Sequence, residues 1–130
     1  MVNGLSLLRI RLLIPFLYLL LLAGCAAAPD PTVDLSPELA RGYRVYQIHC
    51  SSCHSLHPDE VITGPSLHGI ASRAATRIEG QDAQTYITTS ILNPRAFTTP
   101  GYSQLMPVTF GSTISEEDLD LLIAYLLTLK

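Results

Sequence analysis

The feature that most constrains this chain is the pentapeptide Cys50-Ser51-Ser52-Cys53-His54. Two thiols at this spacing, followed at once by a histidine, form the attachment pattern of a c-type haem. The thiols add to the two vinyl groups of the porphyrin, and a helical turn from Cys50 brings His54 beneath the iron as its proximal ligand. The motif therefore predicts one covalently bound haem c held by Cys50, Cys53 and His54.

Two other kinds of site share the Cys-x-x-Cys pattern, the active site of thiol oxidoreductases and one half of a zinc site. A thioredoxin-like motif lies between a strand and a helix, and no apolar, β-branched strand precedes Cys50. A structural zinc ion needs two further ligands, but His54 and His57 crowd the cysteines and there is no second cysteine pair. Haem attachment is the favoured interpretation, and the thiol and zinc alternatives stay open.

The third cysteine, Cys25, ends a segment with the layout of an export signal. Arg9 and Arg11 precede an apolar run over residues 12–22, and small residues lie just before Cys25. The segment is similar to a bacterial lipoprotein signal, which implies removal of residues 1–24 and lipidation of Cys25.

An uncleaved anchor helix is the alternative, because residues 5–22 are largely apolar, although the run is short for a transmembrane span and contains Pro15. Both interpretations attach the domain to the cell membrane on its non-cytoplasmic face, in the periplasm or outside the cell. If Cys25 carries lipid, no cysteine remains for a disulfide, so stability must come from the core and the haem.

The rest of the chain divides into a linker and one domain. Residues 25–36 are rich in alanine, proline and aspartate, which predicts a flexible linker, and residues 37–130 suffice for a single domain. A domain of this size buries a modest fraction of its surface. We therefore expect loss of the haem to unfold it.

The first predicted helix has Ser36 as its N-cap, Pro37 at its first position and His49 near its end. A glycine inside a helix costs about 1 kcal/mol relative to alanine. Gly42 is therefore expected to mark the close approach of another helix.

The last predicted helix begins after Ser115, which with Asp118 approximates a capping box, and continues to Lys130. The segment between the two terminal helices is predicted to be irregular. Apolar residues recur along the last helix at helical spacing and are expected to be ordinary core: Leu119, Leu122, Ile123, Leu126 and Leu129.

These pieces, in this order, resemble a class I cytochrome c. Gly42-Tyr43-Arg44-Val45-Tyr46 resembles the glycine and aromatic pair of the family, and Leu122-Ile123-Ala124-Tyr125-Leu126 resembles its C-terminal helix. The resemblance implies an all-α class I cytochrome c fold in which the N- and C-terminal helices cross and the haem lies in the core. It also implies that the Pro65 carbonyl, in residues 63–69, accepts a hydrogen bond from the proximal histidine.

Met106 is the only methionine left after removal of residues 1–24, and a thioether suits a low-spin iron that carries one electron. It also lies where the family places its axial methionine, so we predict His54 and Met106 as the two iron ligands. His57 and His68 are the competitors for the sixth position. His49 lies on a helix face turned away from Cys50. All three histidines are expected to be surface or loop residues.

Arg73 follows the Pro65 loop at the position where mitochondrial-type members of the family carry a propionate-binding arginine. A surface arginine is an equally open interpretation. Tyr102 is expected to offer its phenol to the same propionate or to cover the edge of the ring.

Charge limits the partners. Removal of residues 1–24 takes away Arg9 and Arg11, leaving six basic against eleven acidic residues and a net charge of −5. Lys130 is the only lysine, so the chain departs from the lysine ring through which mitochondrial-type carriers dock. A partner must be basic or neutral where it docks, or bind as a fixed subunit. The acidic balance argues against nucleic acid.

The sequence therefore predicts a membrane-tethered monohaem cytochrome c that transfers single electrons in a bacterial respiratory chain and catalyses no bond-making reaction. Residues 90–107 resemble cytochrome c domains associated with respiratory oxidases and dehydrogenases, so its donor and acceptor can include such a membrane complex. A free shuttle and a fixed haem c subunit both fit. The alternative function is a haem-based ligand sensor or peroxidase-like protein with a labile Met106.

Overall fold

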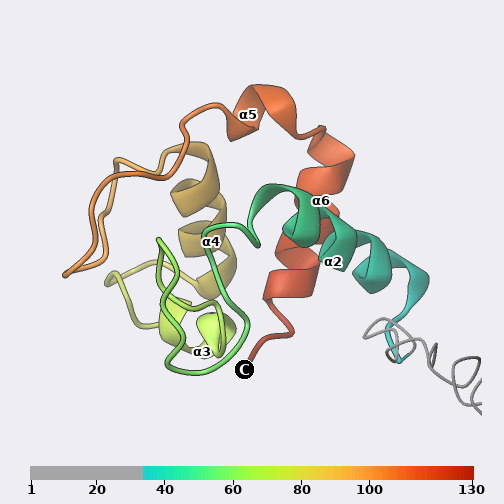
Figure 1. The fold of residues 1–130 in the computed structure, drawn as a ribbon, viewed down its shortest axis with the longest axis horizontal. Coiled ribbons are helices and arrows are strands. Elements are labelled where there is room, and N and C mark those ends of the chain that lie inside the picture. The colour runs from blue at the N-terminus through green and yellow to red at the C-terminus, as the bar shows by residue number, and fades with distance from the viewer. Residues whose placement is uncertain (1–33) are drawn as a thin grey trace, which may run out of the picture. The chain divides into compact units, whose positions relative to one another are not determined.

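The computed structural model describes residues 34–130, so the predicted signal peptide, the lipidation of Cys25 and most of the linker lie outside the described residues. Residues 34–130 contain helices and loops but no strand, which confirms the all-α prediction (Figure 1). None of these helices is long and apolar enough to cross a membrane. The helices are α2 (Pro37–His49), α3 (Ile70–Ala74), α4 (Ala83–Leu92), α5 (Phe110–Thr113) and α6 (Glu116–Leu126).

Helix α2 begins and ends where the sequence predicted. The Ser36 hydroxyl accepts a hydrogen bond from the Leu39 amide at 3.3 Å, and Pro37 occupies the first turn, where a missing N–H costs nothing. At the other end the Cys50 amide donates to the Tyr46 carbonyl at 2.8 Å. The Cys-x-x-Cys-His motif therefore starts at the residue that caps α2.

Helices α2 and α6 cross (Figure 1), and Gly42 lies at their contact, as its helix-breaking cost predicted. A Cβ atom added there would lie 2.1 Å from the Leu121 carbonyl oxygen and 2.8 Å from the Cβ of Tyr125. The Tyr125 ring packs beside Tyr43 and Tyr46, with centroids 5.4 and 6.2 Å apart. The two terminal helices thus touch through backbone at the glycine and through aromatic rings around it.

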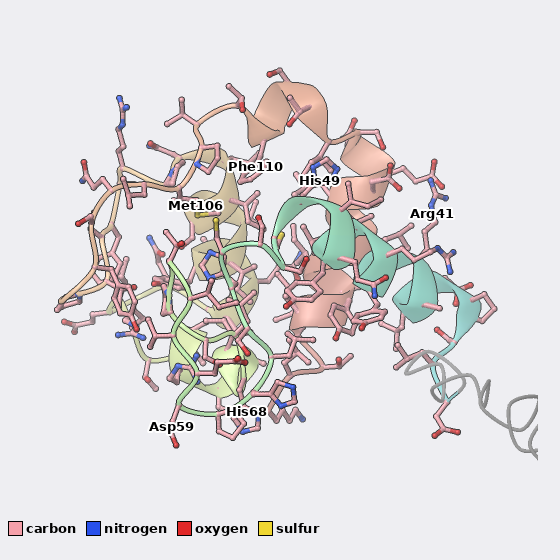
Figure 2. All side chains as sticks on the ribbon, in the orientation of Figure 1. Arg41, His49, Asp59, His68, Met106 and Phe110 are labelled. Carbon is pink, nitrogen blue, oxygen red and sulfur yellow. The ribbon has the colours of Figure 1, made fainter. Side chains whose placement is uncertain are left out.

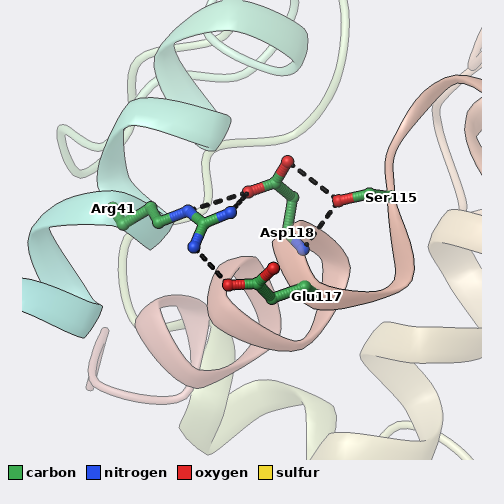
Figure 3. Close-up of polar contacts among 4 residues, drawn as sticks. All are labelled: Arg41, Ser115, Glu117 and Asp118. Carbon is green, nitrogen blue, oxygen red and sulfur yellow. Dashed lines mark hydrogen bonds and ion pairs between the residues drawn. The ribbon is translucent and has the colours of Figure 1, made fainter.

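An ion pair joins the same two helices at the start of α6 (Figure 3). The Arg41 guanidinium contacts Glu117 and lies 3.0 Å from the Asp118 carboxylate. The capping interaction predicted for this helix is present, because the Ser115 hydroxyl accepts from the Asp118 amide at 3.1 Å. Asp118 therefore serves both the cap of α6 and its contact with α2.

Helix α6 ends at Leu126, so the prediction that it continues to Lys130 was wrong. After Leu126 the chain makes a tighter turn, in which the Thr128 amide and hydroxyl both donate hydrogen bonds to the Tyr125 carbonyl, at 3.0 and 2.7 Å. The Leu129 carbonyl then accepts from the Ala71 amide at 3.0 Å. A tertiary contact with the first turn of α3 thus takes the tail out of the helical path.

The middle of the chain is more helical than predicted, because α3, α4 and α5 lie in the segment expected to be irregular. Asp82 caps α4 by accepting from the Thr85 amide at 2.7 Å. Tyr86 and Ile87 enter the core, and the Phe97 ring packs edge-on against Tyr86 at 5.8 Å. Of the apolar residues predicted as core at the end of the chain, Leu122, Ile123 and Leu126 are buried, and Leu119 and Leu129 pack against the cluster while partly exposed.

The buried tyrosines at the helix crossing predict a loss of stability at high pH. Burial raises the pKa of Tyr125 to about 12 and raises that of Tyr46 as well. Above about pH 10 the unfolded chain releases these protons before the folded chain does, so the free energy of unfolding should fall as pH rises. For Tyr125 the slope approaches ~1.4 kcal/mol per pH unit between pH 10 and 12.

Urea unfolding followed by circular dichroism at a series of pH values measures this effect. The Tyr125→Phe variant keeps the ring and removes the titrating group, so it should lose stability less steeply over the same interval. Equal slopes for the two proteins would contradict the assignment to Tyr125.

Candidate haem site

A cavity of about 330 Å³ lies between the end of α2, α3, α4 and the loop before α5. Apolar side chains supply most of its wall, among them Ile87 and Ile91 of α4 and Leu126 of α6. The structure brings every predicted cofactor residue of the folded domain to this cavity: Cys50, Cys53, His54, Pro65, Arg73, Tyr102 and Met106.

The His54 ring is fixed on two sides. Its Nδ1 atom lies 2.8 Å from the Pro65 carbonyl oxygen, the contact that the resemblance implied. Gly64 packs against the ring so closely that an added Cβ would lie 2.4 Å from Cε1. With Nδ1 donating to the carbonyl, Nε2 is the free ring nitrogen, and the acceptor raises its basicity as a metal ligand.

The loop that carries Pro65 is itself tied down. The amides of Thr63 and Gly64 donate to the Cys53 carbonyl at 3.2 and 2.8 Å, which anchors the loop to the Cys-x-x-Cys turn. Farther along, the Ser66 hydroxyl donates to the His57 carbonyl at 2.6 Å. Hydrogen bonds of the residues on both sides of Pro65 therefore fix the position of its carbonyl.

The surroundings of the two cysteines do not suit the alternative sites. Burial raises the pKa of Cys50 to about 11, whereas a nucleophilic thiol in an oxidoreductase has a lowered pKa. Helix α2, rather than a strand, precedes the motif. Among residues 34–130 no three His, Cys, Asp or Glu side chains meet as a metal-ligand group, so a zinc ion would lack its third ligand.

Met106 is half-buried, packs against the core and lines the same cavity as His54. The competitors His57 and His68 are exposed, and Figure 2 shows His68 near the bottom of the domain and Met106 well above it. His49 differs from its prediction, because it is half-buried at the cavity and its ring lies edge-on to Phe110, with the ring centroids 6.3 Å apart. The contact joins the last residue of α2 to the first residue of α5, which helical periodicity within α2 does not show.

Arg73 lies at the cavity, but its guanidinium donates to two backbone carbonyls, at 2.7 Å to Ser66 and more closely to His68. Arg73 thus holds the Pro65 loop from the far side. Arg77, four residues later, is half-buried and also lines the cavity. Arg77 was not predicted, because α3 ends at Ala74 and helical spacing from Arg73 does not place a residue of the following turn. Tyr102 is half-buried at the same wall.

The residues present fit a covalently attached haem. The His54 imidazole, the Met106 thioether and the two cysteine thiols of the Cys-x-x-Cys motif surround an apolar cavity. The absence of a side chain at Gly64 leaves the space that the imidazole occupies. Residues 39–130, most of the chain, match the family model of cytochrome c. The chain belongs to the cytochrome c family.

As a cytochrome c, the protein carries one covalently bound haem c, acts as a haem-based electron carrier and exchanges electrons with redox protein partners. Comparison with curated proteins found no match to this chain.

Gly64 gives a direct test of the proximal side. In Gly64→Ala the new methyl group would lie 2.4 Å from Cε1 and 2.8 Å from Nδ1 of His54, so the ring must leave the Pro65 carbonyl. We expect the yield of haem-loaded, low-spin protein to fall severalfold. Haem content per polypeptide and the absorption spectrum measure this effect.

Gly111→Ala is the matched control, because an added Cβ there meets only the end of the Leu92 side chain, at 3.4 Å. Its yield and spectrum should equal those of the unmodified protein. A Gly64→Ala protein as fully loaded as the control would contradict the packing assigned to His54.

Proposed function

We propose that this cytochrome is a monohaem electron carrier whose haem is attached through Cys50 and Cys53 and whose iron is bound by His54 and Met106. The observation that carries the proposal is the fixed His54 ring, with Nδ1 on the Pro65 carbonyl at 2.8 Å and Nε2 free, in a cavity that Met106 also lines. When bound, the haem supplies a one-electron couple.

The side chains of the chain suit that task. Two protein ligands leave no open position for a substrate, and an apolar wall keeps water and its reorganisation away from the redox centre. No Asp or Glu among the described residues lines the cavity. Arg73 and Arg77 are the cations at the cavity that can pair with carboxylates of the cofactor. The Arg73 guanidinium already donates to two backbone carbonyls, whereas that of Arg77 makes no hydrogen bond within residues 34–130.

The ligand-sensor or peroxidase-like function requires an iron that exchanges Met106 for an outside ligand. A peroxidase also needs a positioned acid or base next to the open site. His49 is a candidate at the cavity, but its ring is packed against Phe110. The carrier function is therefore the one that the side chains favour.

A redox-poised absorption spectrum of the protein, made in a host that attaches haem c, tests the two functions. A methionine-to-ferric-iron charge-transfer band, with no carbon monoxide binding after reduction, is the result expected for a carrier. Absence of the band together with rapid carbon monoxide binding would support the sensor or enzyme.

We propose further that the carrier is exported, cleaved before Cys25 and lipid-anchored there on the non-cytoplasmic face of a bacterial membrane, where it serves a respiratory chain. Arg9, Arg11, the apolar run over residues 12–22 and the small residues before Cys25 support this proposal. Mass spectrometry of the mature N-terminus tests it, since an unmodified or uncleaved terminus would contradict lipidation. Co-purification of a stoichiometric complex after mild solubilisation would favour a fixed subunit over a shuttle.

A further inference from the structure

Ser55, the residue directly after His54, is a buried polar residue with only 5% of its surface exposed. Its hydroxyl accepts a hydrogen bond from the His57 amide at 2.9 Å and donates one to the Glu60 carboxylate. Its carbonyl accepts from the Leu67 amide at 2.8 Å. Ser55 therefore ties two later stretches of the chain to the end of the Cys-x-x-Cys-His motif.

The loop that brings Glu60 back to Ser55 contains a strained turn. Asp59 has a φ angle of 60°, in the left-handed region, and is the one non-glycine residue with a positive φ within residues 34–130. Such a conformation costs free energy and persists where the surrounding structure over-determines it. Glu60 is exposed, so burial of its side chain does not supply that constraint, whereas its hydrogen bond with Ser55 does. We call this hydrogen bond the proximal tie.

The proximal tie lies close to the contact between His54 and Pro65, whose length depends on how firmly each partner is held. The His54 side is held by α2 and its cap. The His54 amide donates to the Cys50 carbonyl at 2.9 Å, and the buried Tyr46 phenol donates to the His54 carbonyl at 2.6 Å. Variation in the contact must therefore come mainly from the Pro65 loop.

The far side of the Pro65 loop is held by the segment that Ser55 organises. The Ser66 hydroxyl donates to the His57 carbonyl at 2.6 Å and more weakly to the Ser55 carbonyl at 3.4 Å. The Leu67 amide also donates to the Ser55 carbonyl. These acceptors keep their positions because the Ser55 hydroxyl closes the turn over residues 55–57. Loss of the proximal tie frees that hydroxyl to rotate and so loosens the Pro65 carbonyl.

We propose that Ser55 and Glu60 are positioning residues that hold the Pro65 carbonyl against His54 and thereby set the reduction potential of the cytochrome. A carbonyl acceptor on Nδ1 raises the basicity of the free Nε2 atom, and a more basic imidazole favours the oxidised iron. A looser Pro65 loop therefore raises the potential. The proposal rests on the carrier function argued above, with His54 as an iron ligand, and adds a control of its potential.

The test uses the full-length holoprotein, made in a host that attaches haem c. Ser55→Ala and Glu60→Ala each remove the proximal tie, and the double variant shows whether the two residues act as one unit. Glu60→Gln removes the charge but keeps an oxygen that can accept from the Ser55 hydroxyl. Asp59→Asn is the matched control for charge, because Asp59 is exposed at the lower edge of the domain in Figure 2 and asparagine also adopts the left-handed conformation.

We expect Ser55→Ala and Glu60→Ala each to raise the ratio of reduced to oxidised cytochrome at a fixed poise roughly threefold, which is about 28 mV for a one-electron couple. The double variant should show the same shift, because one hydrogen bond is lost in all three proteins. Asp59→Asn and Glu60→Gln should change the ratio by less than about 1.5-fold, since exposed charges are screened. The shift is limited because the other hydrogen bonds of the Pro65 loop remain.

Nuclear magnetic resonance of the reduced protein gives a readout that a merely structural role would not move. The Nδ1 proton of His54 exchanges with water only when its hydrogen bond to the Pro65 carbonyl opens. Exchange of this proton should be severalfold faster in Ser55→Ala and Glu60→Ala than in Asp59→Asn. The unmodified protein should match Asp59→Asn.

Three results would overturn the proposal. Ser55→Ala and Glu60→Ala proteins with the potential and the exchange rate of Asp59→Asn would reduce the proximal tie to a structural contact. A shift in Glu60→Gln as large as that in Glu60→Ala would assign the effect to charge rather than to the hydrogen bond. Shifts that add in the double variant would show two independent effects. If Ser55→Ala does not fold, Glu60→Ala, at an exposed position, decides alone.

The carrier function can fail separately. A holoprotein that binds carbon monoxide or lacks the methionine band contradicts that function, whatever the variants of Ser55 and Glu60 do. A His/Met protein whose potential and ring-proton exchange are the same in all the variants contradicts the role of the proximal tie alone.

Discussion

Replacing Gly42 with alanine should lower the free energy of unfolding by about 3 kcal/mol, even though alanine is the better helix former. The added Cβ would lie 2.1 Å from the Leu121 carbonyl oxygen and 2.8 Å from the Cβ of Tyr125. Neither obstacle is the flexible end of a side chain, so α2 and α6 must move apart. That movement opens the aromatic cluster of Tyr43, Tyr46 and Tyr125.

Thermal unfolding of the holoprotein, followed by circular dichroism, measures the loss, which corresponds to a fall in midpoint of more than about 10 °C for a domain of this size. Gly111→Ala again serves as control, because its new methyl group meets only Leu92 at 3.4 Å. Its stability should stay within about 1 kcal/mol of the unmodified protein. Equal midpoints for the two variants would show that the helix crossing can relax at little cost.

The parts of the fold that the sequence predicted well depend on local interactions. The start of α2 is set by the Ser36 hydroxyl and Pro37, and the start of α6 by Ser115 and Asp118, all within one turn of the residues they cap. The Gly42 crossing was predictable because its cost in an isolated helix has to be offset by a tertiary contact. Such signals are present in the residues themselves.

The parts that were missed depend on contacts between distant segments. Helix α4 contains three threonines, which favour helix weakly, and it is stabilised by burying Tyr86, Ile87 and Ile91. The end of α6 depends on the Leu129 carbonyl meeting the Ala71 amide. No pattern within either segment reports these partners.

The haem site also has parts that local sequence predicts and parts that depend on contacts between distant segments. The Cys-x-x-Cys-His motif is local and required no knowledge of the fold. The contact of His54 with Pro65 was implied by the resemblance, and in the structure the two atoms lie 2.8 Å apart. His49 was assigned to the surface because helical periodicity does not show that Phe110 folds over the end of α2. The same limit hid Arg77, whose place at the cavity follows from the turn after α3.

Replacing Met106 with alanine should lower the reduction potential by on the order of 100 mV and let the reduced protein bind carbon monoxide. The thioether is a weak ligand that favours the reduced iron, so its loss stabilises the oxidised state and opens one position. Val108→Ala, two residues away and outside the cavity wall, is the matched control and should leave both properties unchanged. Spectroelectrochemical titration and the spectrum under carbon monoxide measure the two effects.

Because His49 also lines the cavity, the Met106→Ala experiment distinguishes between two candidates for the sixth iron ligand. If Met106→Ala keeps the potential and spectrum of the unmodified protein, the methionine is not bound to the iron, and His49→Ala becomes the variant expected to change them, because His49 also lines the cavity. If Met106→Ala alone changes them, His49 acts only through its packing on Phe110. An unmodified protein that already binds carbon monoxide rapidly would place this cytochrome among haem sensors, because the sixth position would then be open in the resting state.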